Sequence, residues 1–283
     1  MKLTRVFIGI FVLLAIGSVA ASAQKLKVED VIAKHLESIG SPEARSAVKN
    51  IIAVGNGTSK YLSTADLSAE GRLVLASDGP KFFMGINLTG NTNRFADELY
   101  TFDGETSDAA LPRQGSRSNL GSFVQSNKMM IDLGLLGGEL TTGWLISNFA
   151  NKGKLSFAGL KKIDGKEMYA LEFLKKGGGD IEVMLYFDKD TFRHVRTEYK
   201  RMSSAGIGVK PETSSQYNET RYRVVEEFGD HRIEAGVMLP HSYRIVYSTT
   251  GQSGTVEQEW KFTLSEFAAN QKFDPATFRS PGK

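Results

Sequence analysis

The residues best suited to chemistry in this chain are four histidines, His35, His194, His231 and His241. A metal site can be recognised in a sequence when its ligands lie a few positions apart on one element, as in a zinc-binding helix. These four histidines lie far apart in the chain, and none has a partner at metal-ligand spacing. His35 falls on the apolar stripe of a predicted helix, so we interpret it as a packing residue. The sequence therefore predicts no metal site.

Patterns for nucleophilic or acid–base catalysis are also missing from the sequence. It contains no G-x-S-x-G elbow and no H-E-x-x-H helix. The acid pairs Glu226/Glu227 and Asp188/Asp190 are best interpreted as solvated turn or edge residues. The segment that starts at Gly159 resembles a phosphate loop, but five residues separate its two glycines and no Ser or Thr follows the lysine. We expect no catalytic residue, no cofactor and no enzymatic activity.

The first 23 residues have the organisation of a secretory signal peptide. Lys2 and Arg5 precede the apolar run Val6–Ile16, and small residues up to Ala23 form a cleavage site before Gln24. A membrane anchor is the alternative, but the run is shorter than the roughly 20 residues that a spanning helix needs. We expect residues 1–23 to be cleaved and the mature chain to contain no membrane span.

Charge and cysteine content limit the partners and the compartment. Of 35 Lys and Arg residues, two lie in the signal segment, which leaves 33 against 32 Asp and Glu, a net charge of +1. A protein that binds nucleic acid needs a strongly basic face, so we do not expect this chain to bind nucleic acid. The chain has no cysteine, which excludes disulfides, thiolate metal sites and a lipid-modified cysteine. An exported chain without disulfides is typical of a bacterial periplasm.

Strand patterns organise residues 24–283 into one predicted domain. In Asp180–Tyr199, apolar residues alternate with polar ones on both sides of a short polar break, which is typical of a β-hairpin with one buried face. The same alternation recurs along most of the chain. It predicts an α+β fold, in which a curved antiparallel sheet of about ten strands forms an unclosed half-barrel around helical segments. In this scheme Gly229-Asp230 is a turn.

Two regions interrupt the strand pattern. Val28–Ile39 has the apolar stripe of a helix, and Gly40 follows where a helix would end. A helical insertion is expected at about residues 111–150, where Leu111–Asn127 is predicted to be a loop. Met129–Phe149 follows it as an apolar stretch interrupted by glycines. This stretch fits either a broken core helix or a mobile lid over an apolar cavity.

Large aromatic and flexible side chains recur on the apolar strand faces and on the insertion. A curved sheet with such a face must cover it with a helix or with a ligand, because exposed apolar area costs about 25 cal/mol per Å². Half-barrel interiors are common ligand sites. The residues that we expect to line an apolar cavity are Met84, Leu133, Leu136, Trp144, Met184 and Trp260.

Several short motifs resemble the LolA/LolB superfamily of outer-membrane lipoprotein-sorting proteins. The segment Leu174–Tyr199 is similar to its strand–Asp-x-x-Thr–strand hairpin, and residues 163–174 are similar to the hairpin before it. YTFDGE (residues 100–105) resembles a family strand that ends in Asp-Gly. MLPHSYRIVY (238–247) and FDPATFRSP (273–281) resemble the closing strands and tail, and residues 28–50 resemble the N-terminal helix. The resemblance implies an unclosed antiparallel barrel wrapped on an apolar helix, with a cavity for acyl chains.

Together these observations predict a soluble periplasmic protein that binds a lipid or an acylated, lipoprotein-like ligand, with a role in envelope trafficking. The alternative is a sensor or scaffold module that holds a protein partner, as the RseB-type periplasmic regulators of the same fold do. Both functions require binding and neither requires catalysis.

Overall fold

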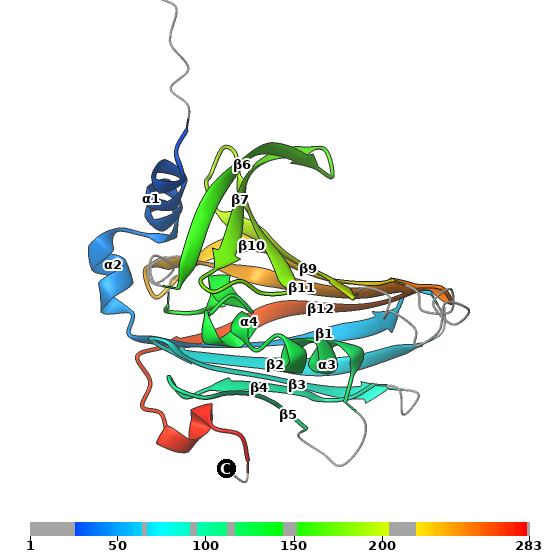
Figure 1. Ribbon diagram of the computed structural model, residues 1–283. Coiled ribbons are helices and arrows are strands. Elements are labelled where there is room, and N and C mark those ends of the chain that lie inside the picture. Colours follow the sequence, from blue (N-terminus) through cyan, green and yellow to red (C-terminus); the bar gives the residue numbers. More distant parts are fainter. Residues whose placement is uncertain are drawn as a thin grey trace, which may run out of the picture.

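The computed structural model describes residues 26–63, 67–90, 95–111, 117–143, 152–203 and 219–281. Its main feature is one antiparallel sheet of 12 strands, ordered β5-β4-β3-β2-β1-β12-β11-β10-β9-β8-β7-β6 (Figure 1). The strands are β1 (Asn50–Tyr61), β2 (Ser68–Asp78), β3 (Lys81–Gly90), β4 (Glu98–Phe102), β5 (Ser107–Ala110), β6 (Gly153–Ile163), β7 (Lys166–Lys175), β8 (Ile181–Asp188), β9 (His194–Ser203), β10 (Thr220–Glu234), β11 (Val237–Gly251) and β12 (Gly254–Ala269).

Two meanders join through the first and last strands, because β1 pairs with β12 from Ile51↔Ala269 to Tyr61↔Gln258. The sheet order leaves β5 and β6 as edges, so the sheet does not close. The predicted α+β half-barrel is therefore confirmed, with 12 strands rather than about ten. The short strand β5 consists of Ser, Asp and Ala, and it gave no strand signal because it lacks large apolar side chains.

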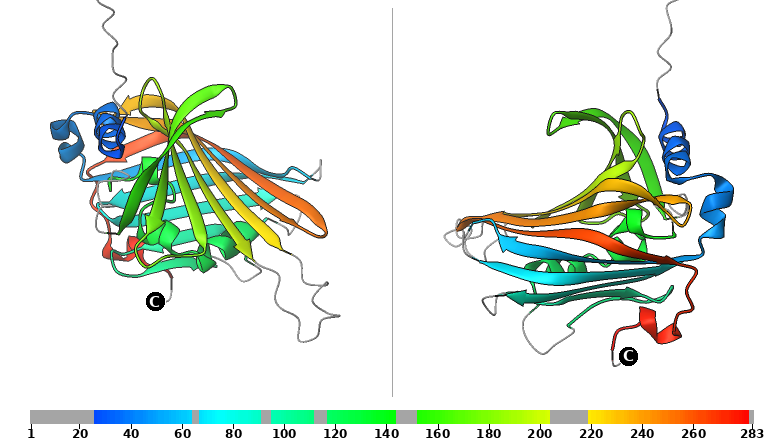
Figure 2. Two further views of the ribbon diagram at one scale, coloured as in Figure 1. Left: turned by 45° about the horizontal axis from the view of Figure 1, so that its top comes forward. Right: turned by 180° about the vertical axis from the view of Figure 1, so that it is seen from behind.

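The sheet curves around the helical insertion, whose segments lie on one of its faces (Figures 1 and 2). That face carries the main core, which contains Val183, Leu185 and Phe187 of β8. The alternating residues Met184 and Tyr186 lie on the other face, here called the outer face. There they form the outer cluster, together with Met168 and Ala170.

The N-terminal helices pack at one end of the sheet. Helix α1 (Val28–Ile39) buries Val31, His35 and Ile39, as its apolar stripe predicted. Helix α2 (Pro42–Ala47) begins after Ser41, whose hydroxyl accepts a hydrogen bond from the Ala44 N–H at 3.2 Å. The chain closes with the short helix η3 (Pro275–Phe278).

The insertion between β5 and β6 contains three short helices, α3 (Asn119–Ser126), α4 (Met129–Asp132) and η1 (Gly138–Leu140). The prediction of a loop over Leu111–Asn127 was wrong for the α3 portion. Ser118 caps this helix by accepting a hydrogen bond from the Gly121 N–H at 2.7 Å, and its apolar side chains are buried under the sheet. Tertiary burial thus stabilises a helix whose sequence is rich in turn formers.

The predicted turn at Gly229-Asp230 was also wrong. Strand β10 continues to Glu234, and its pairing with β11 skips Asp230, which has a φ of 49°. Asp230 is therefore an unpaired position within the strand, and the register is the same on both sides of it, from Gly229↔Ser242 to His231↔Pro240. The reversal occurs at Ala235-Gly236, where both residues have positive φ. Because the strand continues past Asp230, His231 lines the candidate site described below.

Candidate functional site

The residues expected to line a cavity divide between the two faces of the sheet. Met84, Leu136 and Trp260 lie together in the main core and are at most 1 % exposed. Leu133 is partly buried against the same core. Met184 does not join them, because the twofold alternation of β8 turns it into the outer cluster. Trp144 lies outside the described residues.

The insertion covers the inner face of the sheet with its own apolar side chains. Fully or almost fully buried residues come from α3, from α4 and from the segment that follows; they are Leu120, Phe123, Val124, Met129, Met130, Ile131, Leu135, Leu136 and Leu140. Side chains at Met84 and Trp260 therefore contact a packed protein interior in this structure. An acyl chain at these positions would have to displace the insertion.

A buried carboxyl group anchors the insertion to the sheet. The Gly137 N–H donates to Glu226 Oε1 at 2.7 Å, and the Tyr199 hydroxyl donates to Glu226 Oε2 at the same distance. The Tyr243 hydroxyl also donates to Oε1. Burial raises the pKa of Glu226 to about 7, although these three donors partly oppose the rise.

A second polar group forms where η1 meets α1 and β9. Glu139 Oε2 lies 3.4 Å from His194 Nδ1 and 3.8 Å from His35 Nε2, and all three side chains are almost fully buried. Burial lowers the pKa of His35 to about 4 and that of His194 to about 3, so both imidazoles are neutral at pH 7. Burial also raises the pKa of Glu139, while the charges of His35, His231 and Arg193 act against this rise.

We call Glu139, His35, His194 and His231 the histidine cluster. Within the described residues, no group of three or more His, Cys, Asp or Glu could hold a metal ion. Sequence reasoning did not predict this cluster, since its members come from four separate elements and share no local spacing.

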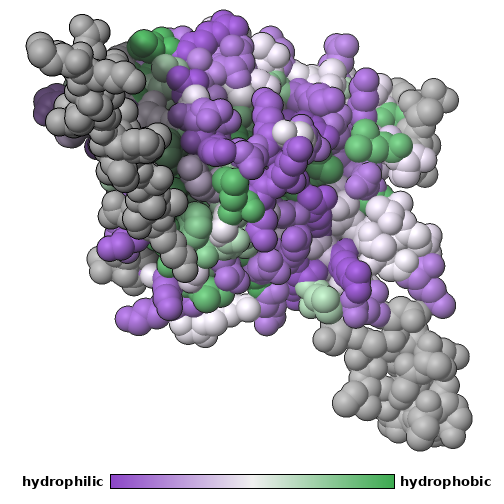
Figure 3. All heavy atoms as spheres, turned by 90° about the horizontal axis from the view of Figure 1, so that it is seen from above, coloured by the Kyte–Doolittle hydropathy of each residue, from purple (hydrophilic) through white to green (hydrophobic). Residues whose placement is uncertain are grey.

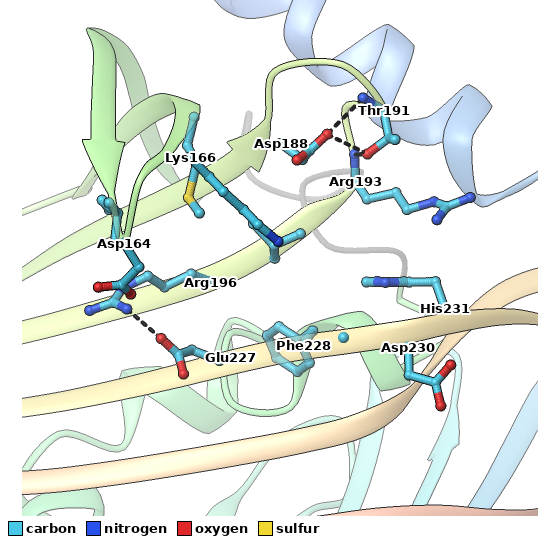
Figure 4. Close-up of a pocket in the computed structure, with 14 residues that line it drawn as sticks. Asp164, Lys166, Asp188, Thr191, Arg193, Arg196, Glu227, Phe228, Asp230 and His231 are labelled. Carbon is cyan, nitrogen blue, oxygen red and sulfur yellow. Dashed lines mark hydrogen bonds and ion pairs between the residues drawn. The ribbon is translucent and has the colours of Figure 1, made fainter.

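One pocket, here called the turn pocket, lies beside this cluster and has a volume of about 430 Å³ (Figure 4). Its walls are formed by the β6–β7 turn, by the β8–β9 turn and by the part of β10 around Asp230. Ile163, Met168 and Val195 give it an apolar wall that is continuous with the outer cluster. Its polar lining consists of Asp164, Lys166, Asp188, Thr191, Arg193, Arg196, Glu227, Asp230 and His231.

A second pocket, here called the strand-end pocket, lies at the opposite ends of β7–β10 and has a volume of about 670 Å³. Leu174, Ile181, Met202 and Tyr222 supply its apolar lining. Basic residues line it from β9 and β10, and acidic residues line it from β7, β8 and the connection between them. The charged residues are Lys200, Arg201, Arg221, Arg223, Glu172, Asp180 and Glu182.

Cross-strand ion pairs occupy much of the outer face between these pockets. Arg196 and Arg244 both pair with Glu227, the latter at 2.5 Å, and Arg244 Nε also contacts Glu259 at 2.7 Å. Lys261 extends the row by contacting Glu259 at 3.1 Å. Seen from above, the molecule accordingly presents mostly hydrophilic side chains with small hydrophobic patches (Figure 3). The name ion-pair row is used below for these residues: Arg196, Glu227, Arg244, Glu259 and Lys261.

None of the helices in the described part of the chain has the length and apolar content needed to cross a membrane.

Comparison with known proteins gives only distant likenesses of structure. No family model matches the sequence, and no curated protein matches it. A LolA superfamily protein from Nitrosomonas europaea is 14 % identical with a TM-score of 0.43, covering 90 % of this chain and 99 % of its own. A DUF1329 family protein from Desulfovibrio piger is 12 % identical with a TM-score of 0.48, covering 90 % and 98 %.

An outer membrane lipoprotein-sorting protein domain from Vibrio parahaemolyticus is 13 % identical with a TM-score of 0.37 and covers 88 % of this chain and 97 % of its own. The superfamily that the strand motifs resemble is thus represented among these structures. At such identities the likeness concerns the course of the chain and carries no information about a ligand.

Proposed function

We propose that this protein is a non-catalytic binding protein of the bacterial periplasm whose ligand is a lipid or an acylated molecule. The observation that carries the proposal is the strand-end pocket, which combines exposed apolar side chains with a basic wall. An amphipathic ligand with an acidic head would satisfy both parts of this surface.

The apolar part of the strand-end pocket is unusually open to solvent. Leu174 is 49 % exposed and Met202 is 56 % exposed, and both line the pocket beside Ile181. Each methylene group of an acyl chain buried against such side chains contributes about 0.8 kcal/mol. A chain of modest length therefore supplies substantial affinity without any displacement of the main core.

The basic wall of the same pocket suits an acidic head. Arg223 and Lys200 already share Glu198, and Arg221 pairs with Glu219. Arg201 lines the pocket without an ion pair in the described part of the chain. Its guanidinium group can donate two parallel hydrogen bonds to a phosphate or carboxylate.

The strand-end pocket is a different site from the apolar cavity that we expected inside the half-barrel. Met84, Leu136 and Trp260 lie beneath the insertion, so a ligand at these residues requires a second arrangement of that segment. Gly134 and Gly137 join its short helices at positive φ, which provides the joints that such a rearrangement would use.

Native mass spectrometry of gently purified protein tests the ligand class, and titration with a fluorescent fatty acid tests the location. We expect Met202→Glu to weaken acyl binding at least tenfold. Ile233→Glu is the matched control, because Ile233 is a strand residue exposed to 70 % and lies outside the pocket. The absence of both co-purifying lipid and fatty-acid binding in the wild type would refute the proposal.

A second candidate function, the holding of a protein partner, is favoured by the free edge of β6. Among the described strands this one, of 11 residues, pairs with β7 alone, and an extended peptide could add to its open side. A pull-down from an envelope extract separates the two functions. A stoichiometric protein partner without bound lipid would favour the scaffold role.

A further inference from the structure

We propose that the turn pocket binds an oxyanion, a phosphate or a carboxylate, through the guanidinium group of Arg193, with His231 beside it (Figure 4). The turn pocket and the strand-end pocket lie at opposite ends of the same strands. This inference therefore does not depend on the proposed lipid ligand.

Three acidic residues of the turn pocket have partners of their own. Glu227 pairs with Arg196 and Arg244, and Asp230 pairs with Arg232 at 2.6 Å. Asp188 Oδ1 accepts hydrogen bonds from the N–H groups of Asp190 and Thr191 and from the Thr191 hydroxyl. These carboxylates form walls of the pocket, and their partners lie within the protein. Asp164 is exposed on the rim.

The guanidinium group of Arg193 has no direct partner. Among the described residues its side chain makes no hydrogen bond and no ion pair, although it is partly buried. Its charge acts on the buried carboxyl group of Glu139 without forming an ion pair with it. The guanidinium group can therefore bind an external oxyanion directly.

Two unsatisfied nitrogens lie on the same side of the turn pocket. Arg193 Nε and His231 Nε2 are buried and have no hydrogen-bond partner among the described residues, and their side chains lie near each other in Figure 4. A buried donor without an acceptor costs about 1–3 kcal/mol. An oxyanion can accept hydrogen bonds from the Arg193 guanidinium group, and from His231 in the tautomer that carries its proton on Nε2. The Arg196 guanidinium group lies on the opposite side of the pocket, where it pairs with Glu227.

The size of the turn pocket adds a further criterion. Its volume of about 430 Å³ exceeds that of a bare phosphate or carboxylate, and Ile163, Met168 and Val195 line the remaining space. The oxyanion can therefore be free or be the head of a larger molecule whose apolar part lies against this wall. Both sources share the same chemistry at Arg193.

Isothermal titration calorimetry of the full chain tests the site with inorganic phosphate, glycerol 3-phosphate, acetate and octanoate as separate probes. We expect saturable binding of at least one probe and a loss of at least tenfold in affinity in Arg193→Gln. Arg72→Gln is the matched control, since Arg72 is an exposed arginine that pairs with Glu266 and does not line the pocket. Circular dichroism reports whether each variant folds.

Arg193→Lys keeps the positive charge but removes the planar guanidinium group. This variant replaces Arg193→Gln in the test if the glutamine variant does not fold. We expect it to keep the native structure and to bind the probe more weakly than the wild type. Binding of inorganic phosphate or acetate identifies a free anion as sufficient. Binding of glycerol 3-phosphate or octanoate alone identifies the head of a larger molecule. No binding of any probe, or equal binding by wild type and the Arg193 variants, would overturn the proposal.

Discussion

The backbone N–H of Gly137 donates a hydrogen bond to the carboxyl group of Glu226 at 2.7 Å, and this contact joins the insertion to the middle of the sheet. Gly137 has a φ of 62° and belongs to the segment that covers the inner face, whereas Glu226 is a fully buried residue of β10. The contact fixes where the insertion lies, so both residues yield direct tests of the structure.

Substitution of Gly137 tests how closely the insertion packs. A Cβ atom there would lie 2.9 Å from Met84 Cε and 3.0 Å from Leu75 Cδ1, in addition to the strain of a positive φ. We expect Gly137→Ala to lower the free energy of unfolding by about 2–4 kcal/mol, combining backbone strain with overpacking. Urea denaturation measures the loss.

Gly134→Ala is the matched control for this prediction. Gly134 has a φ of 67°, but nothing lies within 4 Å of a Cβ at that position. Its loss should be limited to the backbone strain, about 1–2 kcal/mol. Equal losses in the two variants would show that the insertion does not pack against Met84.

The raised pKa of Glu226 makes stability depend on pH. The folded state keeps the proton up to about pH 7, whereas the unfolded state releases it near the ordinary value of 4.5. The contribution of this group is therefore fully present below pH 4.5 and is lost as the pH rises to about 7. Gln cannot ionise, so Glu226→Gln should lack this loss.

Urea denaturation of the wild type and Glu226→Gln at pH 5 and pH 8 measures the difference. We expect the wild type to lose about 1–3 kcal/mol more than the variant over this interval, because one pKa unit corresponds to about 1.4 kcal/mol. Glu227→Gln, on the outer face, should follow the wild type. Parallel curves for the wild type and Glu226→Gln would contradict the prediction.

The histidine cluster acts in the opposite direction. The pKa values of His35 and His194 fall from 6.5 to about 4 and about 3, so the unfolded state binds protons first as the pH is lowered. Their contribution is fully present above pH 6.5 and is lost as the pH falls toward 4. Neighbouring Glu139 and His231 titrate in the same environment.

Thermal denaturation between pH 7 and pH 4 compares the wild type with His35→Gln and His194→Gln. Each variant should lose less stability on acidification than the wild type, because one proton-binding group is removed from the unfolded state. The stability of each variant at lower pH is compared with the stability of the same variant at pH 7. This comparison separates stability lost through altered packing from stability lost through titration. An unchanged acid slope in both variants would contradict the neutral state of these imidazoles.

The ion-pair row should contribute modestly and respond to salt. Glu227 contacts Arg196 and Arg244 at once, and its side chain is 27 % exposed. Partly exposed pairs contribute about 0–1 kcal/mol each, so Glu227→Gln should cost roughly 1–2 kcal/mol at low ionic strength. The cost should shrink in 1 M salt because exposed charges are screened.

Arg221→Gln supplies the comparison for the ion-pair row. Among the described residues Arg221 pairs only with Glu219, and its side chain is 70 % exposed. Its loss should leave stability unchanged within about 0.5 kcal/mol. A cost equal to that of Glu227→Gln would mean that the row gains nothing from its shared contacts.

The sequence alone predicted the features that depend on neighbouring residues. The alternation in β8 and β9 predicted their hairpin, and Asp188 closes the turn between them by accepting hydrogen bonds from Asp190 and Thr191. The stripe of α1 predicted its buried side, including His35. These patterns are local, because φ/ψ preferences and a period of 2 or 3.6 are properties of the segment itself.

Only the tertiary structure decided which face of each strand is inner and which residues meet. A period of two has two equivalent faces, and the packing of the insertion selects Val183 and Leu185 over Met184 and Tyr186. The approach of His194 to Glu139 is likewise non-local, because it joins a strand to a short helix of the insertion. Such contacts follow from the pairing of whole strands and from burial, which no local spacing encodes.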